Sequence, residues 1–166
     1  MLYNNSTICH DRHNFKVNLE YDDSAILPWV EYDGHGPVSD WTRRSKESGE
    51  MVLCSDRGMH RYYDYAKAVK IAKRDGWDSA PYSDTETRGQ KAAKAALADY
   101  NYLRRFLNDQ WHYCGVIVEL LDDSGDAMGE SESLWAIESD DYDHIETTAH
   151  ELASEILDRL QHALSA

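Results

Sequence analysis

Side chains able to bind a metal ion gather at two places near the start of the chain. Cys9, His10 and His13 fall within five residues, and Asp33 and His35 stand on either side of a glycine. Thiolate, imidazole and carboxylate groups are the usual zinc ligands in proteins. The spacing matches no common zinc finger, and turns that need glycine explain the second segment equally well. A metal-dependent enzyme of nucleic-acid or nucleotide metabolism, built on these residues, is therefore kept as an alternative interpretation.

Motifs of the common catalytic classes are missing from the sequence. It contains no G-x-S-x-G, no phosphate-binding P-loop, no H-E-x-x-H and no dinucleotide fingerprint. The segment from Asp122 to Asp126 has the spacing that opens an EF-hand calcium loop. However, Ala127 replaces the required glycine, and Ser133 replaces the final glutamate. We therefore expect a protein that is not an enzyme and that carries no cofactor.

Acidic residues are concentrated in the last third of the chain. Residues 115–166 carry 14 Asp and Glu and one base, Arg159, within a chain whose net charge is −14. Carboxylates three or four residues apart on a helix lie about 5–6 Å apart, close to the ~6–7 Å between neighbouring phosphates of one DNA strand. A folded acidic surface would therefore resemble a nucleic-acid backbone to a basic protein. Solubility is the alternative explanation of the acidity.

We predict that this acidic face binds a protein partner. Repulsion among its carboxylates destabilises the isolated fold, so association with a basic partner is favoured. The candidate residues lie in the turn after the predicted central strand, before the last predicted helix and on that helix: Asp122, Asp123, Asp126, Glu138, Asp140, Asp141, Asp143, Glu146, Glu151, Glu155 and Asp158.

The middle of the chain has the opposite character. Residues 41–114 carry 14 bases and 10 acids, and several of the bases adjoin Tyr62, Tyr63 and Tyr65. Cations interleaved with aromatic rings bind single-stranded nucleic acid by charge and stacking. A small nucleic-acid-binding module is therefore a third interpretation, beside the simpler view that these cations form a solvated surface. The bases concerned are Arg57, Arg61, Lys67, Lys70, Lys73, Arg74, Arg104 and Arg105.

Hydrophobic periodicity predicts the elements that must position these residues. Alternating and β-rich runs predict strands at residues 14–21, 50–54, 111–121 and 132–138, the last two forming a hairpin. A repeat of three and four predicts helices over residues 61–76, 86–109 and 143–163. Residues 22–50 show no period and are expected to form a long ordered loop, with a short helix near residues 40–46.

The predicted order of elements is ββααββα. It indicates an α+β fold, an antiparallel sheet of about four strands with three helices on one face. No repeat or linker divides the 166 residues, so residues 1–166 are expected to form a single domain.

Three distant cysteines predict no disulfide framework, and no apolar run approaches the roughly 18 residues of a membrane span. The start of the chain lacks the basic and apolar segments of a signal peptide, and the missing disulfide framework makes a reducing cytosol the expected location.

Three stretches of the sequence carry a family resemblance. They are Pro28-Trp29-x-Glu31-Tyr32-Asp33-Gly34-His35-Gly36-Pro37-Val38-Ser39-x-Trp41, Cys54-Ser55-Asp56-Arg57-Gly58 and Asn108-x-x-Trp111-His112-Tyr113-x-Gly115-Val116. They resemble a family of small bacteriophage and prophage proteins, over most of residues 15–121. The resemblance implies a phage origin and carries over no catalytic residue. Small acidic phage proteins often inhibit host defence, several of them by mimicking DNA.

The leading interpretation joins the charge pattern to this resemblance. We predict a phage-encoded inhibitor that acts in the cytoplasm of an infected bacterium. It would occupy the nucleic-acid-binding surface of a bacterial defence complex, such as a CRISPR effector or a restriction enzyme. The expected partner is thus a protein, and neither direct DNA binding nor membrane association is expected.

Overall fold

The computed structural model describes residues 4–31, 33–77 and 85–165. The chain divides into two compact units, the second inserted between the two segments of the first. Unit 1 comprises Met1–Ala25 and Trp111–Ala166, and unit 2 comprises Ile26–Gln110. The single domain expected from the sequence stays a prediction.

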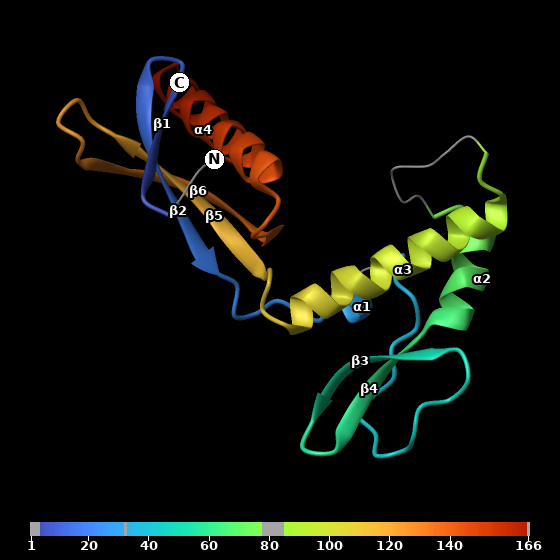
Figure 1. Ribbon diagram of the computed structural model, residues 1–166. Coiled ribbons are helices and arrows are strands. Elements are labelled where there is room, and N and C mark those ends of the chain that lie inside the picture. The colour runs from blue at the N-terminus through green and yellow to red at the C-terminus, as the bar shows by residue number, and fades with distance from the viewer. Residues whose placement is uncertain (1–3, 32, 78–84, 166) are drawn as a thin grey trace. The chain divides into compact units, whose positions relative to one another are not determined.

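Unit 1 contains a four-stranded antiparallel sheet (Figure 1). Its strands are β1 (Ser6–His10), β2 (His13–Tyr21), β5 (Tyr113–Leu121) and β6 (Ala127–Glu138), in the spatial order β1-β2-β5-β6. The turn between β1 and β2 holds Asp11 and Arg12 at φ 46° and 69°, the left-handed pair that a type I′ hairpin requires. This tight turn sets His10 opposite His13 across the hairpin.

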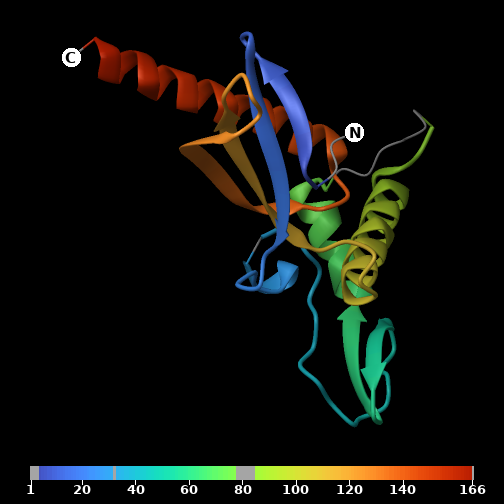
Figure 2. The same ribbon diagram turned by 90° about the vertical axis from the view of Figure 1, so that its left-hand side faces the viewer.

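The helix α4 (Tyr142–Leu164) covers one face of this sheet (Figure 2). Asp141 caps its N-terminus by accepting a hydrogen bond from the backbone N–H of His144 at 3.0 Å. The apolar stripe of α4 packs on the strand side chains that alternate inward. The buried core is formed by Ile8, Phe15, Val17, Cys114, Val116, Val118, Leu120, Ile137, Ile145, Ala149, Leu152, Ala153, Ile156 and Leu157. Neither α4 nor any other helix of the described residues is long and apolar enough to cross a membrane.

Unit 2 combines a two-stranded sheet with three helices. The strands β3 (Glu50–Asp56) and β4 (Met59–Asp64) form a hairpin, and the helices are α1 (Pro28–Glu31), α2 (Tyr65–Asp75) and α3 (Arg88–Leu107). Gly76 ends α2 in the left-handed conformation, at φ 70°. Thr87 and Gln90 form a capping box at the start of α3. The main core of unit 2 consists of Leu53, Tyr63, Ala68, Ala96, Tyr100 and Leu103.

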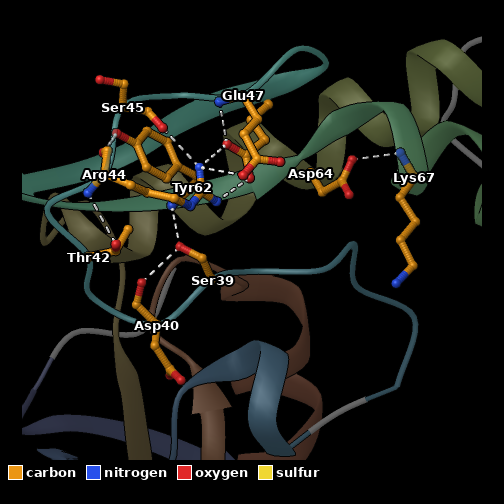
Figure 3. A network of polar contacts seen from close by, with 10 residues as sticks. Ser39, Asp40, Thr42, Arg44, Ser45, Glu47, Tyr62, Asp64 and Lys67 are labelled. Atoms are coloured by element: carbon orange, nitrogen blue, oxygen red, sulfur yellow. Dashed lines mark hydrogen bonds and ion pairs between the residues drawn. The ribbon is translucent and has the colours of Figure 1, made fainter.

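Hydrogen bonds hold the segment before β3 against the hairpin of unit 2 (Figure 3). The backbone N–H of Tyr62 donates to Ser39 Oγ at 2.9 Å, and the Tyr62 hydroxyl donates to the carbonyl of Arg44 at 2.8 Å. The Arg44 guanidinium forms two hydrogen bonds with Glu50, at 2.7 and 2.5 Å, which lower the pKa of Glu50. The segment is thus ordered as predicted. Residues 40–46 are not helical, and that part of the prediction is wrong.

The α+β fold and an antiparallel sheet of four strands are confirmed, whereas the predicted order ββααββα is wrong in detail. The described elements follow the order ββαββααββα, because β1, β4 and the short α1 were not predicted. The predicted strand 50–54 pairs with β4 instead of joining the sheet of unit 1. Residues 61–64, predicted as the start of a helix, also belong to β4. Tyr62 and Tyr63 favour a strand because bulky aromatic side chains pack well on extended backbone.

Candidate functional site

The two units differ strongly in charge. Unit 1 carries 18 acidic and 3 basic residues, a net charge of −15, whereas unit 2 carries 13 acidic and 14 basic residues. Nearly all of the excess charge of the chain therefore belongs to one folded unit. A fixed arrangement of uncompensated carboxylates attracts cations and basic surfaces from solution.

The outer side of α4 carries three acidic side chains in a row. Glu151, Glu155 and Asp158 are exposed and follow one another at intervals of four and three residues, which places them along one flank of the helix. We call these three residues the acidic flank. Within the described part of the chain, none of them forms an ion pair. Glu146 is also exposed, but it lies about 140° around the helix axis from Glu151 and so outside the flank.

Arg159, the one base of residues 115–166, is bound within unit 1. Its guanidinium donates hydrogen bonds to the carboxylate of Glu132 and, at 3.1 Å, to that of Glu130. The hydrogen bond with Glu132 raises the pKa of Arg159. Both glutamates belong to β6, so this arginine links α4 to the edge of the sheet. It leaves the acidic flank uncompensated.

The remaining predicted partner-binding residues are divided between the two ends of β6. Asp122, Asp123 and Asp126 lie in the turn before the strand, and Glu138, Asp140, Asp141 and Asp143 lie at its other end, around the start of α4. The Asp122 carboxylate accepts hydrogen bonds from the N–H groups of Ser124 and Asp126 at 2.8 and 2.9 Å, and thereby shapes the turn. A strand of 12 residues spans roughly 40 Å. The eleven predicted residues therefore lie in separate groups, of which the acidic flank is one.

The fold does not bring the five predicted metal ligands together at one place, although His10 and His13 are paired across the β1–β2 hairpin. Cys9 and His10 point to opposite faces of β1, because successive strand residues alternate. Asp33 and His35 belong to unit 2. His10 meets His150 of α4, with 3.1 Å between the two Nδ1 atoms. In the described part of the chain, no three His, Cys, Asp or Glu side chains are grouped to hold a metal ion.

Asp99 of α3 organises a polar cluster in unit 2 that the sequence analysis missed. Its Oδ1 lies 2.6 Å from His35 Nδ1, and its Oδ2 accepts hydrogen bonds from the Gly36 N–H and the Tyr63 hydroxyl, each at 2.7 Å. Only 9% of the Asp99 side chain and 16% of the His35 side chain are exposed. The available signal was an aspartate within the apolar stripe of α3, three residues after the buried Ala96.

The cluster fixes the donor role of the Tyr63 hydroxyl. Burial, and then the hydrogen bond to Asp99, raise the pKa of the Tyr63 phenol, which therefore stays protonated and donates. With both Asp99 oxygens accepting, the His35 ring donates from Nδ1, and its Nε2 is not bonded to this carboxylate. An imidazole held in this way can accept a proton or bind a metal ion. Among the described residues, only Asp99 hydrogen-bonds to this ring. This contact does not test the interpretation as a metal-dependent enzyme, which stays a prediction.

A groove between β3 and α3 is lined by two bases and one amide side chain, together with Glu50 and apolar side chains of both elements. Its volume is about 650 Å³, and it shares Arg104 and Asn108 with a neighbouring hollow of about 350 Å³. Lys46 lines the groove and Arg105 lines the hollow. Two of the predicted basic residues, Arg104 and Arg105, thus border a concave surface of unit 2.

The other predicted basic residues lie elsewhere in unit 2. The Arg61 guanidinium lies 5.2 Å from the ring centre of Trp29 and 5.3 Å from that of Trp41, so cation–π contacts with both rings hold this residue. Arg57 is exposed in the turn between β3 and β4. The exposed bases of α2 are Lys67, Lys70, Lys73 and Arg74. The bases of the tyrosine-rich segment are therefore distributed over the β3–β4 turn, β4 and α2.

The three cysteines are expected to differ in reactivity. Cys9 is exposed, whereas burial raises the pKa of the Cys54 and Cys114 thiols and so lowers the fraction of reactive thiolate. We expect iodoacetamide to modify one thiol of the native protein rapidly and the other two slowly, as followed by mass spectrometry. The Cys9→Ser variant should lose the rapid phase. A rapid phase that persists in this variant would contradict the exposure described above.

Comparisons with known proteins add no family to this description. No family model, no curated protein and no solved structure matches the chain. The phage resemblance therefore stays an expectation from the sequence, and the candidate sites rest on the geometry described above.

Proposed function

We propose that unit 1 binds the basic, nucleic-acid-binding surface of a protein partner through the acidic flank of α4. On this proposal the protein is a phage-encoded inhibitor that blocks a bacterial defence complex, such as a CRISPR effector or a restriction enzyme. The observation that carries the proposal is the acidic flank itself, three exposed carboxylates without ion pairs in a unit of net charge −15.

The acidic flank suits a basic groove in both spacing and rigidity. Its carboxylates recur at intervals close to those of DNA phosphates. The opposite side of α4 is buried in the core through Ile145, Leu152 and Ile156, so the carboxylates keep their spacing without a partner and lose little entropy on binding. Charge complementarity of this kind accelerates association and makes it sensitive to salt.

The proposal is tested by capture from a bacterial lysate. The tagged protein should retain one nucleic-acid-binding complex, which a salt gradient releases and which added DNA displaces. Displacement by DNA is the decisive readout, because it requires that the protein and DNA compete for one surface. A partner that is retained equally well with excess DNA would contradict the proposal.

The groove of unit 2 favours a second function, binding of single-stranded nucleic acid. Lys46 and Arg104 supply positive charge, and Asn108 supplies an amide that can bond to phosphate oxygens or bases. Fluorescence anisotropy with a labelled single-stranded oligonucleotide at low salt distinguishes the two functions. Binding that Arg104→Glu abolishes would favour the groove, whereas a DNA mimic should not bind the oligonucleotide.

A further inference from the structure

We propose that His10 and His150 together bind one divalent transition-metal ion, of which Zn²⁺ is the ion to test. Both residues belong to unit 1, and neither is part of the acidic flank or lines the groove of unit 2, so this proposal does not rest on the functions proposed above. It would link the β1–β2 hairpin to α4, two parts of unit 1 that are 140 residues apart in the sequence.

The separation of the two imidazoles fits shared coordination. Two nitrogen ligands, each 2.0–2.1 Å from a tetrahedral zinc ion, lie about 3.3–3.4 Å apart. The two Nδ1 atoms are 3.1 Å apart, and the ring centroids are 5.3 Å apart. An ion bound by both nitrogens would lie beside the line that joins them, so the rings would have to turn toward it while the two nitrogens move apart by a few tenths of an ångström. Without an ion, one Nδ1 must donate a hydrogen bond to the other.

Both histidines are held in place by the core of unit 1. His10 follows the buried Ile8 on the face of β1 that packs against α4, and the half-buried His150 comes directly after the buried Ala149 of the helix. Both rings remain partly accessible to solvent, so an ion could reach them. Two ligands fixed in this way lose little entropy when they coordinate an ion, which raises the affinity of a site with only two protein ligands.

Charge and ligand chemistry both favour a transition-metal ion. The net charge of −15 on unit 1 concentrates divalent cations near its surface. Among these cations, imidazole nitrogen prefers zinc, nickel and copper, whereas magnesium and calcium prefer oxygen. Magnesium would therefore interact with the carboxylates and leave the histidine pair to the transition metal.

The test is a calorimetric titration of the untagged chain with ZnCl₂ in excess Mg²⁺. We expect one ion per chain, and at least a tenfold loss of affinity in His10→Ala and in His150→Ala. The matched controls are His144→Ala and His162→Ala, which remove exposed histidines of the same helix and should bind zinc as the wild type does. Equal affinity in the His150→Ala and His144→Ala variants would overturn the proposal.

A second measurement does not depend on the folding of a variant. Zinc should shift the imidazole ¹⁵N resonances of His10 and His150 in the wild-type protein and leave those of His144 and His162 in place. It should also raise the midpoint of thermal unfolding, because an ion bound only to the native state stabilises that state. Shifts confined to other histidines, or no change in the midpoint, would overturn the proposal.

Discussion

Replacing Glu151, Glu155 and Asp158 together by lysine is expected to weaken binding of the DNA-competing partner roughly 100-fold at low salt. Each exposed ion pair contributes up to about 1 kcal/mol, so loss of three pairs accounts for roughly 3 kcal/mol, or about two decades in the dissociation constant. Repulsion from the new lysines adds to this loss. The effect should shrink as salt is raised, because exposed charges are screened. Surface plasmon resonance over a salt series measures both the loss of affinity and its dependence on salt.

The triple variant should fold, since the three residues are exposed and lysine is a good helix former. The matched control replaces three exposed acids of unit 2, Glu31, Asp40 and Asp56, and changes the net charge by the same amount. This control should bind the partner as the wild type does. If both variants lose binding equally, net charge and not the acidic flank is responsible.

The sequence predicts those elements of the fold whose pattern is local and strong. Residues 143–163 were predicted as a helix, and α4 occupies 142–164, because its apolar residues recur at three and four over many turns. The β5–β6 hairpin was found for a similar reason, from a β-rich run followed by turn residues. The strand β4 was missed because the helical repeat that begins at Tyr65 was extended backward over Tyr62 and Tyr63.

Contacts between distant parts of the chain could not be predicted in this way. Nothing local in the sequence relates His10 to His150 or Arg159 to Glu132, since each pair depends on how α4 crosses the sheet. The eleven acidic residues were predicted as one partner-binding set from their concentration in the last third and their spacing, whereas in the fold the length of β6 separates them into groups. The segregation of charge along the chain can thus be read from the sequence, but the shape of a charged surface depends on the fold.

Replacing Asp99 by alanine is expected to lower the free energy of unfolding of unit 2 by roughly 3–4 kcal/mol. The carboxylate accepts hydrogen bonds from His35, Gly36 and Tyr63, and a buried donor that loses its acceptor costs about 1–3 kcal/mol. The Tyr63 hydroxyl keeps a partner in the carbonyl of Ala96 at 3.1 Å. The cost therefore falls mainly on the other two donors.

Amide hydrogen exchange during a urea series measures this effect in each unit separately. The amides of α3 should lose protection at a lower urea concentration in Asp99→Ala, while those of α4 serve as an internal reference. Asp33→Ala is the matched control, because this exposed aspartate lies in the same segment as His35, and its removal should change stability by no more than about 0.5 kcal/mol. The stability of the Tyr63→Phe variant should lie between those of Asp99→Ala and Asp33→Ala. This change removes one donor and leaves the pairing of Asp99 with His35 and Gly36 intact. If Asp99→Ala proved no more harmful than Asp33→Ala, the cluster would not hold the 33–39 segment to α3, and His35 would not be positioned by it.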